Sequence, residues 1–244
     1  MTTICIHQPA FLPWLGLIES MFACDVFVHL DDVQYEEGGF QNRNRIKTAD
    51  GVEWLTLPVS KNLKDRIDRV TISQAYRPKK LLRTLEVAYG STPYFNTVMP
   101  ELAPIFMQEH PTRLIDVSLP LLDAISRMLT CPCRFIRASD IRDDSSSRLG
   151  RLAGIYAATG ADALYTGSGV RKYCTEEELR EQGIEPIWHQ YETRHLVYRQ
   201  NFARQGFQPF LSVIDLLFNC GCDFAADALQ RSAREVVAAR GKTH

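Results

Sequence analysis

Short hydrophobic runs alternate along the chain with segments whose hydrophobic residues recur at helical spacing. Ile4 to His7 is a short hydrophobic run, and Trp14 to Cys24 carries hydrophobic residues three and four positions apart. A second run, Val26 to Leu30, follows at once. This order of strand, turn, helix and strand predicts a crossover unit with two parallel strands at the start of the chain.

The same pattern continues along the chain and indicates its fold class. We expect further strands near residues 134–136, 163–165 and 185–189, separated by helices, and a helical middle segment at about 77–130. Val52 to Val59 and Ile67 to Ile72 alternate and predict a β-hairpin. The expectation is an α/β protein, with one domain over residues 1–244 and an open, mostly parallel sheet covered by helices on both faces.

Composition and charge reduce the range of partners. The 244 residues are 45% hydrophobic and 23% charged, with a formal net charge of −1. No basic excess favours nucleic acid or an anionic membrane surface. The first residues lack the pattern of a signal peptide, and no run of about 18 apolar residues occurs. We therefore predict a cytoplasmic protein that binds neither nucleic acid nor membrane.

The cysteines do not have the spacing of a zinc site. Cys131 and Cys133, like Cys220 and Cys222, have one residue between them, whereas paired zinc ligands have two to four residues between them. The histidines are scattered singly. We expect no structural metal, although Asp31 and Asp32 leave open a loosely held divalent ion brought by a phosphate ligand.

Two candidate catalytic residues follow the first two strands. His7 ends the first strand, where ligands of open α/β sheets bind, and an imidazole there can act as a general base. Asp32 follows the second strand and could orient His7, bind a cation or hold hydroxyl groups. In the alternative interpretation, His7 orders the turn that follows it, and Asp32 is a solvated loop residue or caps a helix or turn.

Residues 31–51 are polar and predict a long functional loop. Arg43 and its neighbours are rich in hydrogen-bond donors, which suits a small anionic ligand such as a phosphate. A solvated basic loop is the alternative. The candidate substrate-binding side chains of this segment are Gln34, Asn42, Arg43, Asn44 and Lys47. We expect His7, Asp32, Arg43 and Asn44 to line one pocket.

Later segments add weaker candidates. Gly167 and Gly169 follow a predicted strand, so their backbone could approach an anion beside Arg171. His189 and Gln190 follow another strand, and His195 is a further candidate base. No nucleophile elbow, Walker loop or HExxH motif occurs. Cys174, close to Arg171 and Lys172, is the cysteine that we name as a candidate nucleophile.

The motifs together resemble one known family. His7-Gln8-Pro9, Leu12-Pro13-Trp14-Leu15-Gly16, Asp31-Asp32-Val33-Gln34-Tyr35 and Gln41 to Thr48 look like the WbqC-like family, as does Ser212 to Asn219. Gln8 joins the candidate binding residues on this basis. The resemblance implies a role in surface-polysaccharide or natural-product biosynthesis, with transfer of an acyl or aminoacyl group onto an amine. The implied donor is bound to phosphopantetheine or a nucleotide, and an acyl carrier protein is a possible partner.

A weaker likeness is to the HIGH-motif nucleotidyltransferases. The order of strand, proline-bearing turn and helix is similar, but Trp14 and Leu15 stand near the places of the two signature histidines. Three hypotheses follow: a transferase with His7 as base, a nucleotide-binding enzyme with a degenerate nucleotidyltransferase fold, and a non-catalytic module that binds a carrier protein or nucleotide sugar.

Overall fold

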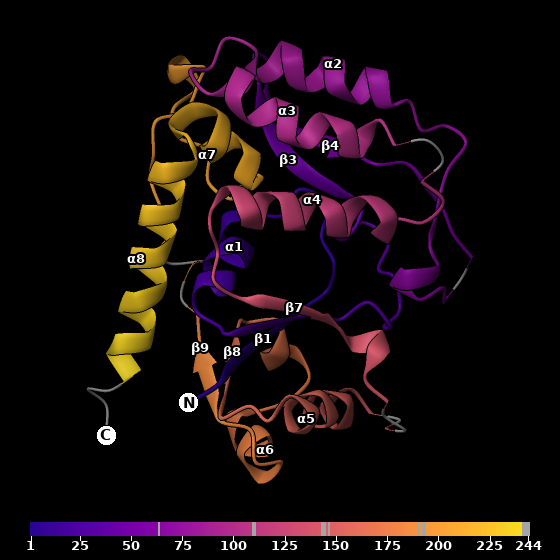
Figure 1. Ribbon diagram of the computed structural model, residues 1–244, viewed down its shortest axis with the longest axis vertical. Helices are drawn as coiled ribbons and strands as arrows, with labels where there is room; N and C mark the ends of the chain where they lie inside the picture. The colour runs from indigo at the N-terminus through magenta and orange to yellow at the C-terminus, as the bar shows by residue number, and fades with distance from the viewer. Residues whose placement is uncertain are drawn as a thin grey trace.

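A five-stranded sheet organises the molecule. The computed structural model describes residues 1–62, 64–108, 111–142, 145, 147–189, 191 and 194–240. All neighbouring strands of the sheet are parallel, in the order β7-β2-β1-β8-β9 (Figure 1). The strands are β1 (Thr3–His7), β2 (Val26–His29), β7 (Arg134–Arg137), β8 (Ala163–Thr166) and β9 (Pro186–Trp188). Strand order therefore reverses between β1 and β8, which creates a topological switch point.

Helices cover both faces of this sheet, which confirms the expected α/β class. Ile4, Val26 and Leu164 point to one face and pack with α5 (Arg148–Thr159) and α6 (Glu176–Glu181). The alternate residues of the same strands face the larger core, which contains α1 (Leu15–Phe22), α7 (Val213–Cys220) and α8 (Cys222–Arg240). All four residues of β2 and of β8 are buried, so these strands are covered on both faces and are mostly hydrophobic in sequence.

Local capping contacts fix the ends of α5 and α6. The hydroxyl of Ser147 accepts a hydrogen bond from the Gly150 amide at 2.9 Å, and Gly160 ends α5 with a φ of 62°. Thr175 and Glu178 form a capping box at the start of α6. Serine or threonine before the first turn and glycine after the last are the residues that favour such caps.

A long insertion between β2 and β7 packs on the sheet face that borders the larger core (Figure 1). It begins with two small antiparallel pairs, β3 with β4 and β5 with β6, and continues as three helices. Its elements are β3 (Arg43–Thr48), β4 (Gly51–Thr56), β5 (Val59–Ser60), η1 (Ile67–Arg69), β6 (Thr71–Ile72), α2 (Pro78–Tyr89), α3 (Phe95–Phe106) and α4 (Ile115–Met128). The remaining short 3₁₀ helices are η2 (Ala138–Asp140), η3 (Val170–Lys172) and η4 (Ala203–Gln205).

The expected hairpin pairing is wrong in detail. The segment predicted as a loop contains β3, which pairs with β4 from Arg43 opposite Thr56 to Thr48 opposite Gly51. The expected pairing of residues 52–59 with 67–72 is reduced to the two residue pairs of β5 and β6. The physical reason is that most of β3 is polar, so it lacks the hydrophobic alternation by which a half-buried strand is recognised.

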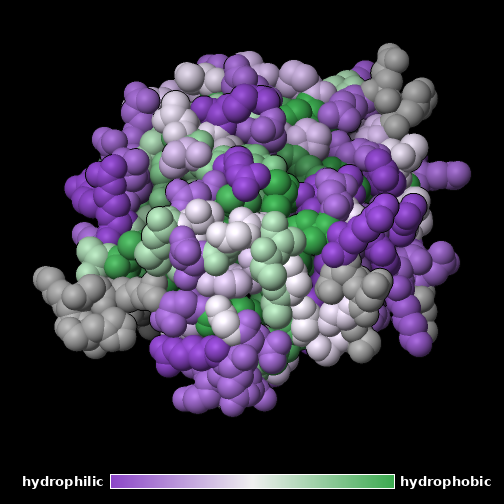
Figure 2. Space-filling model, turned by 60° about the horizontal axis from the view of Figure 1, so that its bottom comes forward, coloured by the Kyte–Doolittle hydropathy of each residue, from purple (hydrophilic) through white to green (hydrophobic). Residues whose placement is uncertain are grey.

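The surface around α5 and α6 combines hydrophilic and hydrophobic residues. Seen from the side of α5 and α6, hydrophilic residues cover most of the periphery and hydrophobic ones gather toward the middle (Figure 2). None of the helices in the described part of the chain combines the length and hydrophobicity that a membrane-spanning segment needs.

Candidate functional site

His7 lies at the carboxyl end of β1, beside the switch point. Its ring stacks on Phe27 with an interplanar angle of 8° and a centroid distance of 5.9 Å. Its Nε2 atom is buried and has no hydrogen-bond partner among the described residues. A buried polar atom without a partner costs about 1–3 kcal/mol, so this nitrogen is a candidate contact for a ligand.

Cys5, two residues earlier on the same strand face, sets the protonation of His7. Burial by itself would lower the pKa of His7, but the charge and hydrogen bond of the Cys5 sulfur outweigh it and raise this pKa above its ordinary value. In turn the pKa of Cys5 falls to about 6, because hydrogen bonding by Cys24 and the charge of His7 outweigh burial. Cys5 is not among the predicted candidates, although the period of two along a strand places it on the side of His7.

His29 differs from His7 although the two are paired in register at the ends of β1 and β2. Burial lowers the pKa of His29 to about 4. The charges of Arg137 and His7 lower this pKa further, whereas the charge of Asp31 raises it. His29 is therefore neutral at pH 7. Of the two imidazoles, His7 is the one suited to proton transfer near neutral pH.

The end of β8 is shaped around His189. A Cβ atom added to Gly167 would lie 2.1 Å from Nε2 of His189, so only glycine leaves room for this imidazole. The ring stacks on Tyr165 at 6.1 Å, and Nδ1 accepts a hydrogen bond from the Tyr191 amide at 3.3 Å. A side chain at Gly169, in contrast, would meet open space.

The loop after β1 is braced by distant residues. Leu12 has a φ of 46°, an uncommon value for a residue other than glycine. Its carbonyl oxygen accepts hydrogen bonds from Asn44 Nδ2 at 2.7 Å and from Ser212 Oγ at 2.8 Å. Asn44 thus holds the loop that follows His7, and its amide is occupied by that task.

Gln8 and Gln41 meet at the same end of β1. Nε2 of Gln41 donates to Oε1 of Gln8 at 2.6 Å, and Oε1 of Gln41 is buried without a partner. Asn42, next to Gln41, has both ends of its amide engaged. It accepts from the Tyr35 hydroxyl and donates to the Leu57 carbonyl, each at 2.9 Å.

Lys47 is fully buried within a separate polar cluster. Its ammonium donates to the Gly206 carbonyl at 2.7 Å and to Oε1 of Gln200 at 3.2 Å. Burial lowers its pKa, and Asp215 opposes that effect. Burial raises the pKa of Asp215 to about 6, although hydroxyls of Tyr198 and Tyr89 donate to it at 2.8 and 2.9 Å.

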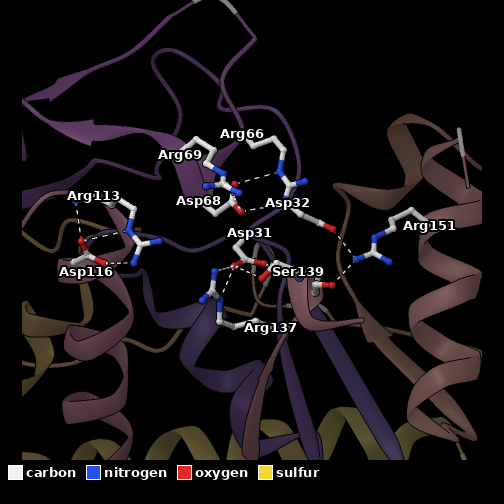
Figure 3. A network of polar contacts seen from close by, with 11 residues as sticks. Asp31, Asp32, Arg66, Asp68, Arg69, Arg113, Asp116, Arg137, Ser139 and Arg151 are labelled. Carbon is white, nitrogen blue, oxygen red and sulfur yellow. Dashed lines mark hydrogen bonds and ion pairs between the residues drawn. The ribbon is translucent and has the colours of Figure 1, made fainter. Parts of the chain in front are cut away.

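Asp31 and Asp32 belong to a network of ion pairs at the ends of β2 and β7 (Figure 3). The buried carboxylate of Asp31 accepts from Arg137 at 2.6 Å and from the amide and hydroxyl of Ser139 at 3.0 Å. Asp32 pairs with Arg151 of α5 at 2.6 Å, and its Oδ1 is buried without a partner. The contacts of Asp32 therefore go to Arg151, and those of His7 to Cys5.

Three further predicted residues each contact a different partner. Arg43 lies 4.2 Å over the ring of Trp54 and donates to the Gly38 carbonyl. Gln34 is exposed, and its backbone forms an isolated antiparallel β-bridge with Arg66. Arg171 is exposed and stacks on Trp188 at 4.1 Å, and Gln190 lies outside the described residues.

The predicted candidates are thus brought together only in part. His7 and Gln8 share the end of β1 with Gln41, whereas Asn44 lies behind the adjoining loop. Two hollows of about 300 and 220 Å³ lie between α1 and α8 and around Arg199, and His7, Asp32, Arg43 and Asn44 line neither. In the described ranges, no three His, Cys, Asp or Glu side chains converge as a metal site.

One family model matches most of this chain. The model of the WbqC-like protein family matches residues 8–226. A protein of Mycobacterium tuberculosis named "Uncharacterized protein Rv1507c" is 32% identical over 227 residues, which cover 91% of this chain and 96% of that protein. No solved structure matches the chain.

Proposed function

This chain belongs to the WbqC-like protein family, and from that premise we propose that it is a small-molecule transferase that moves an acyl or aminoacyl group onto an amine, with His7 as general base. The observation that carries the proposal is the buried, unpartnered Nε2 of His7 at the switch point between β1 and β8. Crevices at such points are where open α/β sheets bind ligands.

The protonation of His7 suits this role. A base with a raised pKa binds a proton more strongly, and general bases work best with a pKa near the working pH. Cys5 is 0% exposed and is therefore proposed as the partner of His7, not as a nucleophile. This replaces Asp32, whose carboxylate pairs with Arg151, as the group that sets the state of His7.

The proposed step needs no covalent intermediate. The acceptor amine attacks the carbonyl carbon of a thioester, the C–N bond forms and the C–S bond breaks. His7 takes the proton that the amine loses and returns it to the departing thiolate. Gln8 and Gln41 offer an amide pair beside His7, and the free Oε1 of Gln41 can accept a hydrogen bond from the acceptor amine.

A phosphate on the donor would find positive charge nearby. Among the described residues, the ion pairs drawn in Figure 3 join five arginines to four aspartates, at the ends of β2 and β7, in η1 and at the start of α4. Arg69 is the most available of these arginines, because its side chain is 71% exposed and lies 3.8 Å from Asp68. Phosphopantetheine, free or on an acyl carrier protein, carries such a phosphate.

A second candidate is a nucleotide-binding enzyme with a degenerate nucleotidyltransferase fold. The strand order β7-β2-β1-β8-β9 favours it, because dinucleotide-binding sheets have the same order. The glycine-bearing turn after β8, with open space at Gly169, would let backbone amides approach a phosphate. A non-catalytic binding module is the third candidate.

Ligand-induced stabilisation and turnover separate the three. Coenzyme A should raise the melting temperature if the donor is a pantetheine thioester, and ATP should do so if the site takes nucleotides, since a ligand of the native state stabilises it. Product formation is then measured by mass spectrometry, with acetyl-coenzyme A as donor and glucosamine as acceptor. His7→Ala should lower the rate by about 10²–10⁴.

The matched control is His29→Gln, which changes the neighbouring imidazole that is neutral at pH 7. It should retain activity within a few-fold. If His7→Ala binds coenzyme A and turns over like the unmodified protein, His7 is a turn-ordering residue and the base must be sought at His189 or His195.

A further inference from the structure

A polar hollow lies away from His7, where three segments meet. It has a volume of about 220 Å³ and is formed by the turn between α2 and α3, the segment that leads into η4, and the end of α7. Its lining residues are Ser91, Thr92, Pro93, Arg199, Gln200, Asn201, Phe202, Ala203 and Asn219. It is smaller than the clefts of about 300–1,000 Å³ that hold drug-sized ligands, so it suits a ligand the size of one sugar ring.

Two asparagines offer oriented acceptors to this hollow. Nδ2 of Asn201 donates to the Ala88 carbonyl at 2.8 Å, and Nδ2 of Asn219 donates to the Asp215 carbonyl at 2.8 Å. These contacts fix which end of each amide remains for a ligand. Oδ1 of Asn201 is buried and receives no hydrogen bond from the part of the chain that the structure describes, so a ligand hydroxyl would supply the missing one.

Phe202 adds an aromatic wall and a strained backbone. It lines the hollow with a φ of 51° and a ψ of 54°, in the left-handed region that bulky residues avoid. Such strain costs about 1–3 kcal/mol and gathers at ligand sites. Phe202 is the aromatic residue of the lining, and an aromatic ring can pack against the C–H face of a sugar.

Arg199 makes the hollow suited to an anionic ligand. Its side chain is exposed and forms no ion pair with the described residues. No acidic side chain is among the lining residues. A guanidinium in this setting favours a phosphate or carboxylate, which it can hold with two hydrogen bonds.

We propose that this hollow is a second binding site that takes a single sugar ring bearing one anionic group. The features that carry the proposal are amide acceptors for hydroxyls, an aromatic lining residue, and a guanidinium without an ion pair among the described residues. The site shares no residue with the end of β1, so it stands or falls independently of the role of His7.

The test uses the full-length ¹⁵N-labelled protein and follows the side-chain amide signals of Asn201 and Asn219. Glucose 6-phosphate and glucuronate are titrated to about 10 mM, a range that detects weak sites, with glucose and inorganic phosphate as partial ligands. Both anionic sugars should shift the two signals, and each partial ligand should bind at least about tenfold more weakly than glucose 6-phosphate. The relative affinities of the two anionic sugars show whether the site prefers a phosphate or a carboxylate.

Arg199→Ala should weaken binding of glucose 6-phosphate by about tenfold or more, because a charge-assisted hydrogen bond is lost. Arg204→Ala is the matched control, since Arg204 is exposed in the neighbouring η4 and does not line the hollow. It should bind as the unmodified protein does, and His7→Ala should as well. Thermal melting confirms that each variant is folded.

Three results would overturn the proposal. One is the absence of any shift at the Asn201 and Asn219 amides with either anionic sugar. Another is inorganic phosphate binding as tightly as glucose 6-phosphate, which would indicate a plain anion site. The third is equal loss of binding in Arg204→Ala and Arg199→Ala, which would indicate attraction by net charge alone.

Discussion

Asn44, in β3, and Ser212, at the start of α7, donate hydrogen bonds to the same atom, the carbonyl oxygen of Leu12. This shared acceptor joins the insertion and the C-terminal helices to the loop that follows His7. Leu12 has a positive φ, so the two donors hold a backbone conformation that its side chain disfavours.

The two donors should act as a unit. Asn44→Ala or Ser212→Ala should each lower the free energy of unfolding by about 1–3 kcal/mol, because one buried hydrogen bond to Leu12 is lost. The double variant should lose more than the sum, with a coupling of about 0.5–3 kcal/mol, since Leu12 is then left with neither donor. Urea unfolding of all four proteins measures the coupling, and strict additivity would contradict it.

The pKa of His7 should depend on Cys5. In the unmodified protein the Cys5 sulfur raises this pKa above the ordinary value, while burial acts against it. Cys5→Ala removes the sulfur and leaves burial, so the pKa of His7 should fall below about 6.5. NMR titration of the histidine ring signals measures both values. An unchanged pKa in Cys5→Ala would show that another group sets the protonation of His7.

Asp215 should make the protein less stable as pH rises from about 4 to 6. Burial raises its folded-state pKa to about 6, so in this window the folded protein binds more protons than the unfolded chain, and unfolding is favoured as protons are removed. The loss should be roughly 3 kcal/mol in total and level off above pH 6. Other carboxylates titrate in the same window, so the contribution must be isolated by a variant.

Asp215→Asn supplies that comparison. It keeps the shape of the side chain and cannot ionise, so its stability should fall less between pH 4 and pH 6 than that of the unmodified protein. Urea midpoints at several pH values give the difference between the two profiles. Parallel profiles would mean that Asp215 titrates at an ordinary pKa in the folded state.

Gly167 and Gly169 should respond differently to the same substitution. Gly167→Ala places a Cβ within 2.1 Å of His189, so the imidazole must move, at a cost of about 1–3 kcal/mol. Trp14 packs on His189 with ring centroids 6.2 Å apart, and its fluorescence should report the displacement. Gly169→Ala meets open space and should change stability by no more than about 0.5 kcal/mol. Equal effects of the two substitutions would contradict the packing described at the end of β8.

Much of the fold follows from local patterns in the sequence. The hydrophobic runs of β1 and β2 and the helical spacing of α1 predict the first crossover unit, and Ser147 and Thr175 mark the starts of α5 and α6. These features are legible because periodic burial and capping link residues only a few positions apart. The place of His7 at a carboxyl strand end follows from the same local information.

The roles of the polar residues were decided by tertiary structure alone. Asn44 is engaged by Leu12, Lys47 by Gln200 and Gly206, and Asp32 by Arg151. A polar side chain looks the same in the sequence whether it faces a ligand, water or a buried partner. Burial of such a group is tolerated only where hydrogen-bond partners converge on it. Those partners come mostly from distant segments. For this reason only the tertiary structure shows that the polar residues of β3 are braced within the protein and do not form a binding loop.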